Sequence, residues 1–345
     1  MADKTKRDLA AVDAFLTAGG FRRAKRPKGA LVRSRSKCDD RKAPKTLAKK
    51  TRKIEIIRPQ GWHKEWLVSG FSTRIGGHST VFGGNDLNLG FTAHDSKKKV
   101  EKNRKEFFKA LRLLAVGDRQ PDKARKWRIV NSKQIHSAII HVIDSGKAAH
   151  SELVGDGLIT NCPGVLLGIQ TADCVPVLLM DPKKKAIGAF HAGWRGTVQR
   201  IVEKGVGVMR MQYGSDPAGL HAAIGPSIQK CCYTVGDEVV DQFHSQFAYA
   251  RSIFREVYDD DPIKLKYPLL FLTARAPGHS NIGPQIHLDL VEANRRQLLD
   301  AGLRPENIWP SNLCTSCHTD KLFSHRKEDG FTGRMMAVVG LKESG

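Results

Sequence analysis

The sequence lacks any apolar run long enough to cross a membrane. A membrane span needs about 18 or more consecutive apolar residues. The longest candidate, residues 165–180, is interrupted by Gln170, Asp173 and Pro176. The apolar core of a secretory signal is also missing, because charged side chains are spread over the first eight positions. We therefore expect a cytoplasmic protein that has no contact with membranes.

Acidic residues are scarce relative to basic ones. The chain of 345 residues has 35 Asp and Glu against 57 Lys and Arg, a net charge of +22. More than half of this excess lies in residues 1–53, which hold 18 basic and 5 acidic side chains. Residues 22–53 also have few large apolar side chains with which to build a core. We expect 1–53 to be a disordered, solvated extension rather than a nucleic-acid tether, and 54–345 to form one domain.

Beyond residue 53 the sequence alternates short apolar runs with amphipathic stretches. Residues 70–90 are rich in glycine and turn-forming residues, and residues 250–285 have no clear period, so we interpret 250–285 as an insertion loop. Interleaved strands and helices favour a single mixed α/β domain. The expected strands are 53–58, 127–130, 139–143, 157–160, 165–169, 175–180, 186–191, 222–224 and 335–341, and the expected helices are 96–114, 197–213, 236–247 and 290–301.

The seven cysteines are odd in number and scattered, which favours reduced thiols or a metal over a disulfide framework. Cys314, Cys317 and His318 form the C-x-x-C-H pattern of c-type haem attachment, but that chemistry requires an exported protein. A structural zinc site would need a second pair of ligands. The adjacent residues Cys231 and Cys232 are poor candidates for that pair, so we expect Cys314 and Cys317 simply to pack near the functional site.

Three candidate ligands, His136, Cys174 and His191, lie at the ends of different expected strands. Catalytic zinc characteristically takes three protein ligands and leaves a fourth position open. Two imidazoles and a thiolate suit zinc and also copper. The same residues suit a nucleophilic pair, in which Cys174 attacks, an imidazole acts as base and Asp173 orients that base. The residues alone leave both interpretations open.

Arg74, Arg195 and Arg326 each lie beside turn residues. An arginine next to exposed backbone amides is a suitable phosphate ligand. Ion pairing at the surface is the alternative for each of them.

A series of short motifs runs in order from about residue 65 to 343. The motifs are Phe71-Ser-Thr-Arg-Ile-Gly-Gly-His-Ser79, Asn88-Leu-Gly90, Asn103-Arg104, Gln134-Ile-His-Ser137, Gly155-Asp-Gly157, Gln170-Thr-Ala-Asp-Cys174, His191-Ala-Gly-Trp-Arg-Gly196, Ile224-Gly-Pro226, Cys232-Tyr233, Cys314-Thr315, Phe323-Ser-His-Arg326 and Gly333-Arg334. Together they resemble the YfiH-like family of purine nucleoside phosphorylases, formerly named the multicopper polyphenol oxidoreductase laccase family.

The resemblance implies a four-layer α/β/β/α sandwich with mixed sheets. It also implies a zinc ion, or copper as the alternative, held by His136, Cys174 and His191. The implied activity is phosphorolysis of adenosine, inosine and 5′-methylthioadenosine, which yields free base and ribose 1-phosphate, with adenosine deamination as a side activity. The resemblance assigns no function to residues 1–53 and 250–285.

Purine nucleosides and phosphate are the expected partners, and we assign hypothetical roles on that basis. Arg74, Arg195 and Arg326 are expected to bind substrate and phosphate. Asp173 is expected to protonate or hydrogen-bond the departing purine, beside Cys174 and Arg195 in the catalytic set.

Three rival functions remain at this point. One is a hydrolase or deamidase with Cys174 as nucleophile, and another is a copper-dependent polyphenol oxidase. Dioxygen-reducing multicopper chemistry is disfavoured, because none of the 13 histidines forms a His-x-His pair. The third rival is nucleic-acid binding through residues 1–53.

Overall fold

The computed structural model describes residues 53–116, 127–144, 153–257 and 285–343. Of these, residues 53–116, 127–144, 153–255 and 286–343 belong to one compact unit. The expected amino-terminal extension lies outside the described residues, apart from Lys53.

The first sheet has five strands in the order β1-β2-β15-β7-β4. Strand β15, the last in the chain, lies between β2 and β7 and is antiparallel to both, whereas β4 is parallel to β7. The sheet is therefore mixed. Its strands are β1 (Ile56–Ile57), β2 (Leu67–Ser72), β15 (Met335–Leu341), β7 (Val165–Thr171) and β4 (Arg128–Val130).

The second sheet has six strands in the order β14-β10-β8-β9-β6-β5. Its four central strands are antiparallel to one another, and each edge strand is parallel to its neighbour. The strands are β14 (Ile308–Pro310), β10 (His221–Ile224), β8 (Val175–Asp181), β9 (Ala186–Ala192), β6 (Gly157–Thr160) and β5 (Ile140–Val142).

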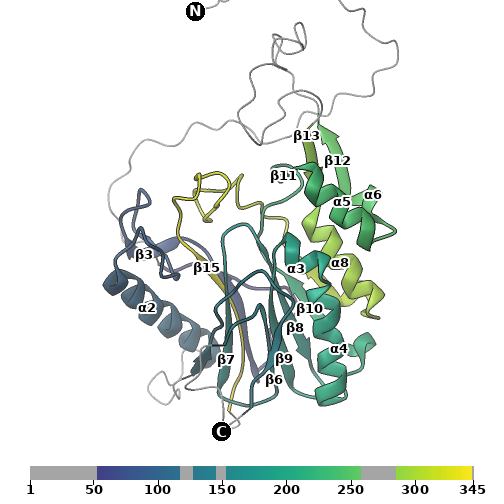
Figure 1. Ribbon diagram of the computed structural model, residues 1–345. Coiled ribbons are helices and arrows are strands. Elements are labelled where there is room, and N and C mark those ends of the chain that lie inside the picture. The colour runs from purple at the N-terminus through teal and green to yellow at the C-terminus, as the bar shows by residue number, and fades with distance from the viewer. Residues whose placement is uncertain (1–52, 117–126, 145–152, 258–284, 344–345) are drawn as a thin grey trace, which may run out of the picture. The chain divides into compact units, whose positions relative to one another are not determined.

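The two sheets pack face to face, with helices on both outer faces (Figure 1). Helix α2 (Lys97–Val116) covers the five-stranded sheet, where Phe107 packs with Val338 of β15. Helices α4 (Ile201–Tyr213) and α8 (Leu290–Asp300) cover the six-stranded sheet. The mixed α/β class is confirmed, and the described elements stack in the α/β/β/α order that the resemblance implies.

The central strands are continuous apolar runs in the sequence because both of their faces are buried. Strands β7, β8, β9 and β15 are buried on both faces, apart from Gln170 at the end of β7. In β8, Leu178 faces the core between the sheets, whereas Val177 and Leu179 face the helices. A strand buried on both faces shows no polar alternation, so the sequence pattern located these strands well.

The described elements differ from the expectations in several places, of which three concern segments that the sequence singled out. The glycine-rich stretch 70–90 includes the end of β2 and the strand β3 (Ile75–Ser79). The expected helix over 197–213 is two helices, α3 (Trp194–Val198) and α4, which are separated at Arg200 with a φ of 61°. The expected loop over 250–285 begins with α6 (Ala250–Ile253) and β12, and residues 258–284 lie outside the described part.

Strand β12 belongs to a small third sheet of order β11-β13-β12. In none of the described helices are length and apolar character together sufficient to span a membrane. The elements not yet given are β11 (Thr234–Val235), β12 (Phe254–Val257), β13 (Gln285–Leu288), α5 (Asp237–Gln246) and two short 3-10 helices, Pro217–Gly219 and Pro305–Asn307.

Glycines make room for one large ring between β9 and the helices. Phe190 is fully buried, and a Cβ atom added at Gly205 of α4 would lie 2.5 Å from its ring. Added Cβ atoms at Gly157 and Gly188 would lie 3.0 and 2.7 Å from the same ring. Close approach of α4 to the sheet therefore depends on a glycine.

Two glycines in α4 provide a matched test of this packing. We expect Gly205→Ala to destabilise the protein by about 1–3 kcal/mol, because the new methyl group overpacks the Phe190 ring. Gly207 is exposed and has open space around its Cβ position, so Gly207→Ala should instead stabilise the helix by up to about 1 kcal/mol. Urea unfolding of both variants measures the two effects. Equal stabilisation by both changes would contradict the packing argument.

Candidate functional site

The structure brings His136, Cys174 and His191 together at one end of the six-stranded sheet. Cys174 directly precedes β8, and His191 lies near the end of the neighbouring strand β9, opposite Pro176. His136 lies in the segment that connects β4 of the first sheet to β5 of the second. The ligand atoms of the three side chains all lie within 4.8 Å of one another.

A buried carboxylate, Asp156, positions both imidazoles. Its Oδ1 accepts hydrogen bonds from His191 Nδ1 (2.8 Å) and from the backbone N–H of His136 (3.0 Å). Its Oδ2 accepts from the backbone N–H groups of Ile135 and Ser137 and from Ser137 Oγ. Asp156 is fully buried, so these donors replace the water that an ionised carboxylate would otherwise require.

The donor set fits a metal ion with three protein ligands. Because His191 donates Nδ1–H to Asp156, its Nε2 is the ring nitrogen left for a metal. His136 Nε2 lies 3.8 Å from Cys174 Sγ, close to the roughly 3.5 Å expected between nitrogen and sulfur ligands of tetrahedral zinc. A Cβ atom at Gly193 would lie 3.0 Å from Cys174 Sγ and 2.9 Å from the His136 ring, so only glycine leaves this space to the ligands.

Without a metal the same groups form a charged pair. Burial alone raises the pKa of Cys174, but His191 and a hydrogen bond from His136 outweigh it and lower the pKa to about 6. Burial lowers the pKa of His191, but the Cys174 thiolate and Asp156 raise it to about 9. Burial likewise raises the pKa of Asp156, and hydrogen bonds from His191 and Ser137 hold it well below its usual value. The thiolate form is also the form that binds metals.

Asp173, immediately before Cys174, joins three segments of the chain. Its Oδ1 accepts a hydrogen bond from Thr315 Oγ1 (2.5 Å), and its Oδ2 accepts one from the backbone N–H of Arg326 (2.6 Å). Its backbone carbonyl accepts a hydrogen bond from Ile228. A φ of 89° at Asp173 is unusual for a residue with a side chain.

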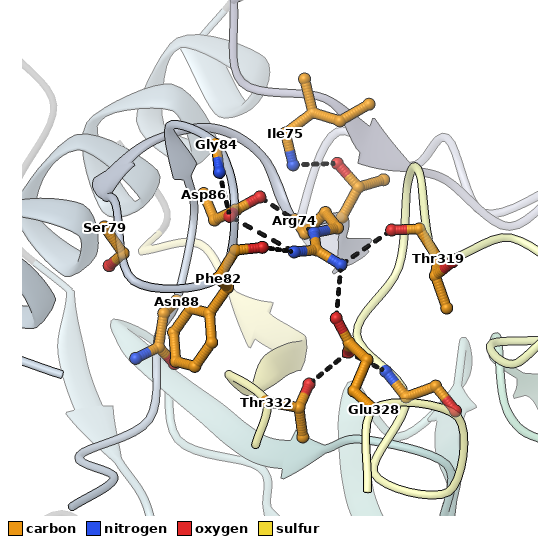
Figure 2. Close-up of polar contacts among 12 residues, drawn as sticks. Arg74, Ile75, Ser79, Phe82, Gly84, Asp86, Asn88, Thr319, Glu328 and Thr332 are labelled. Atoms are coloured by element: carbon orange, nitrogen blue, oxygen red, sulfur yellow. Dashed lines mark hydrogen bonds and ion pairs between the residues drawn. The ribbon is translucent and has the colours of Figure 1, made fainter. Parts of the chain in front are cut away.

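Arg74 is placed differently from the expectation (Figure 2). The side chain is 7% exposed, and its guanidinium stacks 4.5 Å from the centre of the Phe323 ring. All five of its N–H donors are used within the protein, which leaves none for a phosphate. The acceptors are Asp86 Oδ1 and Oδ2, Glu328 Oε1 and the carbonyl oxygens of Phe82 and Thr319.

Two of the expected arginines do lie by the candidate metal ligands. Arg326 is joined through its backbone to Asp173, and its side chain donates to the Thr234 carbonyl. Arg195 is exposed and stacks on Trp194. Neither forms an ion pair with any carboxylate in the described part of the chain, and both are therefore suited to bind an anion.

Two residues of the site carry no role in the sequence-based expectation. Asp156 is the first, and its signal is a carboxylate between two glycines directly before a buried strand. Arg334 is the second and directly precedes β15. It is partly buried, and within the described residues its side chain donates only to the neighbouring carbonyls of Thr332 and Gly333. It also interacts electrostatically with Cys174 and Asp173.

Arg334 also lines a cavity of about 290 Å³. The cavity combines apolar, polar and basic groups from three segments of the chain, as ligand sites commonly do. Its lining is Gly90, Phe91, Thr92, Ala93, His94, Gln170, Gly330, Thr332 and Arg334.

Comparison with known proteins gives consistent results. A family model described as multi-copper polyphenol oxidoreductase laccase matches residues 68–342. The purine nucleoside phosphorylase YlmD of Bacillus subtilis is 34% identical over 286 residues, which cover 81% of this chain and 90% of YlmD. The adenosine deaminase RL5, from an unknown prokaryotic organism, is 35% identical over 218 residues, which cover 61% of this chain and 74% of RL5.

The fold agrees with a solved structure of similar sequence. The crystal structure of the hypothetical protein YfiH from Bacillus licheniformis matches with a TM-score of 0.66 at 33% identity. The match covers 80% of this chain and 93% of that chain. The fold expected from the sequence motifs is thereby confirmed.

Asp156 is the residue on which we expect metal affinity to depend. Asp156→Asn removes the charge that holds His191 Nδ1–H and places an amide group against backbone donors. Loss of a carboxylate that orients a histidine ligand typically lowers metal affinity by about 10- to 100-fold. Competition with a chromogenic chelator for Zn²⁺ measures this change.

Asp181→Asn is the matched control for this variant. Asp181 is also buried, and it accepts backbone N–H groups from Lys183 and Lys184 at the opposite end of β8. We expect that variant to lose stability and to keep its metal affinity. An Asp156→Asn protein with unchanged affinity would contradict the positioning role.

Proposed function

The chain belongs to the multi-copper polyphenol oxidoreductase laccase family, and we propose that it is a zinc-dependent purine nucleoside phosphorylase. The proposed substrates are adenosine, inosine and 5′-methylthioadenosine, each cleaved by phosphate to the free base and the sugar 1-phosphate. Adenosine deamination is the proposed second activity. Relatives named for both activities support an enzyme of this kind.

One observation carries the proposal: a three-ligand metal cluster lies beside arginines that have no carboxylate partner. The ligand atoms of His136, Cys174 and His191 lie within 4.8 Å of one another. Across the described ranges, Arg195 and Arg334 form no ion pair, although both are fully equipped to bind a phosphate bidentately. A cysteine hydrolase would need Cys174 and an imidazole, but its reaction does not require arginines that bind phosphate.

Phosphorolysis requires that phosphate be held against the anomeric carbon of the sugar. We assign this to the guanidinium groups of Arg195, Arg326 and Arg334, which stabilise the charge of the attacking phosphate. Arg74 is left out of this role, because its five donors bind protein acceptors. It acts instead as a support, because it binds Glu328, which accepts a hydrogen bond from Ser324 just before Arg326.

The departing purine needs polar partners that do not lose their protonation state. We assign Asp173 to hydrogen-bond the base, through the lone pairs that Thr315 and Arg326 leave unused. Tyr233 lies among the same charged groups, and burial and the nearby Cys174 thiolate raise its pKa above the ordinary range. It is thus a neutral phenol that can donate a hydrogen bond to the purine.

Zinc is the proposed metal, because two imidazoles and one thiolate with an open fourth position match a catalytic zinc site. When bound, it acts as a Lewis acid that activates water near neutral pH, which is the chemistry that deamination requires. The protein supplies the geometry for this: Asp156 orients His191, and Gly193 leaves the space between the ligands.

A cysteine hydrolase is the second candidate, supported by the lowered pKa of Cys174, about 6. A thiolate beside an imidazole is a nucleophile. Two imidazoles, however, face the same sulfur, whereas a nucleophilic pair needs one. This arrangement favours a metal ligand over a nucleophile.

The activity test compares nucleoside cleavage with and without phosphate. We expect inosine and adenosine to yield free base and ribose 1-phosphate only when phosphate is present, and adenosine to yield some inosine, as separated by chromatography. Cys174→Ala should lose bound zinc and both activities. Full phosphorolysis by a zinc-free Cys174→Ala protein would overturn the role of the metal. Absence of any product, with a thioester trapped on Cys174, would favour the hydrolase.

Arg195 is expected to act on phosphate rather than on the nucleoside. We predict that Arg195→Gln raises the KM for phosphate about tenfold or more, because an ionic hydrogen bond is lost. The KM for inosine should change little. Arg210→Gln, at an exposed position of α4, is the control and should leave both constants unchanged. An equal rise in both KM values for Arg195→Gln would contradict the assignment.

The cytoplasmic location and the absence of nucleic-acid binding by residues 1–53 stay predictions. Copper remains the alternative metal at His136, Cys174 and His191.

A further inference from the structure

A second cluster of sulfur atoms lies outside the candidate active site. The Sγ atoms of Cys231, Cys232, Cys314 and Cys317 all lie within 4.8 Å of one another. The Cys231 and Cys232 sulfurs are 3.6 Å apart and lie 3.5 and 3.4 Å from that of Cys317. The sequence-based view that Cys231 and Cys232 are poor candidates for a second ligand pair is therefore corrected. Two adjacent residues of a tight turn do present both thiols to the same point.

The distances match a metal site better than simple packing. Cys231 and Cys314 are free cysteines, whereas Cys317 is disulfide-bonded. The 3.6 Å between the Cys231 and Cys232 sulfurs exceeds the S–S bond of about 2.05 Å. Two sulfur ligands of one tetrahedral zinc ion lie roughly 3.8 Å apart, given a Zn–S bond of about 2.3 Å. The separation of the Cys231 and Cys232 sulfurs is close to an edge of that tetrahedron. Cys314 is 3% exposed, so the cluster is anchored inside the protein.

Backbone contacts hold the two cysteine-bearing turns together. Ser227 pairs with Cys314 in a parallel bridge, and Thr315 N–H donates to the Ser227 carbonyl. Gln229 N–H points at Cys314 Sγ (3.5 Å), and backbone amides of this kind orient and stabilise thiolate ligands. These contacts fix the positions of the two cysteine-bearing turns relative to one another.

The cluster is separate from the ligands of the first site but is joined to it. Thr315, between Cys314 and Cys317, donates its hydroxyl to Asp173. Ile228, on the other turn, donates its N–H to the Asp173 carbonyl. Both turns are therefore bonded to the residue that precedes Cys174. A metal that fixes these turns would also fix the backbone at the active site.

We propose that Cys231, Cys232 and Cys314 bind a structural zinc ion, with the Cys317 sulfur next to the fourth ligand position. Sulfur ligands in a tetrahedral arrangement favour zinc among the common divalent metals. Closed structural zinc sites contribute directly to folding stability. The proposal depends on the first three thiols. The number of sulfur atoms found around the metal by X-ray absorption shows whether the fourth ligand is also a sulfur.

Metal content of the full chain, purified in a thiol-free reductant, tests the proposal. By elemental mass spectrometry we expect two zinc ions per wild-type chain. We expect one zinc ion in Cys174→Ala and one in the double variant Cys231→Ser with Cys232→Ser. Cys162→Ser is the control, because Cys162 is a free thiol outside both clusters, and it should keep two. One zinc in the wild type that vanishes in Cys174→Ala overturns the structural site and leaves the proposed function standing. One zinc in the wild type that survives in Cys174→Ala supports the structural site and overturns the zinc in the proposed function.

A second measurement does not depend on the folding of the cluster variants. Cys174→Ala removes the sulfur ligand of the first site, so any remaining sulfur–metal signal comes from the cluster. We expect Co²⁺ bound to this variant to show sulfur-to-cobalt charge-transfer bands and the visible bands of tetrahedral cobalt. X-ray absorption of its zinc should give three or four sulfur neighbours. Fewer than three sulfurs, iron in place of zinc, or disulfides among Cys231, Cys232 and Cys314 in metal-free protein would overturn the proposal.

Discussion

The candidate site depends on one buried carboxylate, Asp156, and on the five hydrogen bonds that it accepts. Three come from consecutive backbone N–H groups of residues 135–137, one from a serine hydroxyl and one from His191. Residues 135–137 thus surround the carboxylate of Asp156, and His136 within this segment has a φ of 61°. Such a backbone conformation costs free energy for a residue with a side chain. The ionised carboxylate offsets that cost, and the two imidazoles are fixed by the same group.

Asp173 repeats this principle at the thiol. Its side chain and carbonyl hold the turns that carry Thr315, Arg326 and Ile228, and the next residue is Cys174. Two carboxylates that accept hydrogen bonds on both oxygens thus place the three candidate metal ligands, neither being a candidate ligand itself. Supporting groups of this kind orient first ligands and tune their basicity. The sulfur cluster adds to this support, because both of its cysteine-bearing turns donate hydrogen bonds to Asp173.

The sequence predicted the central strands well because their physics is local. The bounds of 157–160 and 335–341 agree with β6 and β15, since apolar residues fill both faces and turn residues precede each run. Strand β3 was missed because glycines there serve contact rather than turning: a Cβ at Gly77 would lie 2.1 Å from the Asp86 carbonyl. The sequence could not show that the Arg74 donors are used within the protein, because its partner Glu328 lies 254 residues away in the chain. The sulfur cluster was missed for the same reason, as the pairing of Ser227 with Cys314 is visible only in three dimensions.

The distribution of arginine partners separates structural from functional charge. Arg74 is buried against two carboxylates, so its charge is neutralised and its donors are used. Arg195, Arg326 and Arg334 have no such partner in the described part of the chain, yet they lie around Asp173 and Cys174. A divalent metal, if bound by two neutral imidazoles and one thiolate, would add a further net positive charge. The site as a whole is therefore suited to a dianionic phosphate, and a neutral substrate alone would leave that charge without a partner.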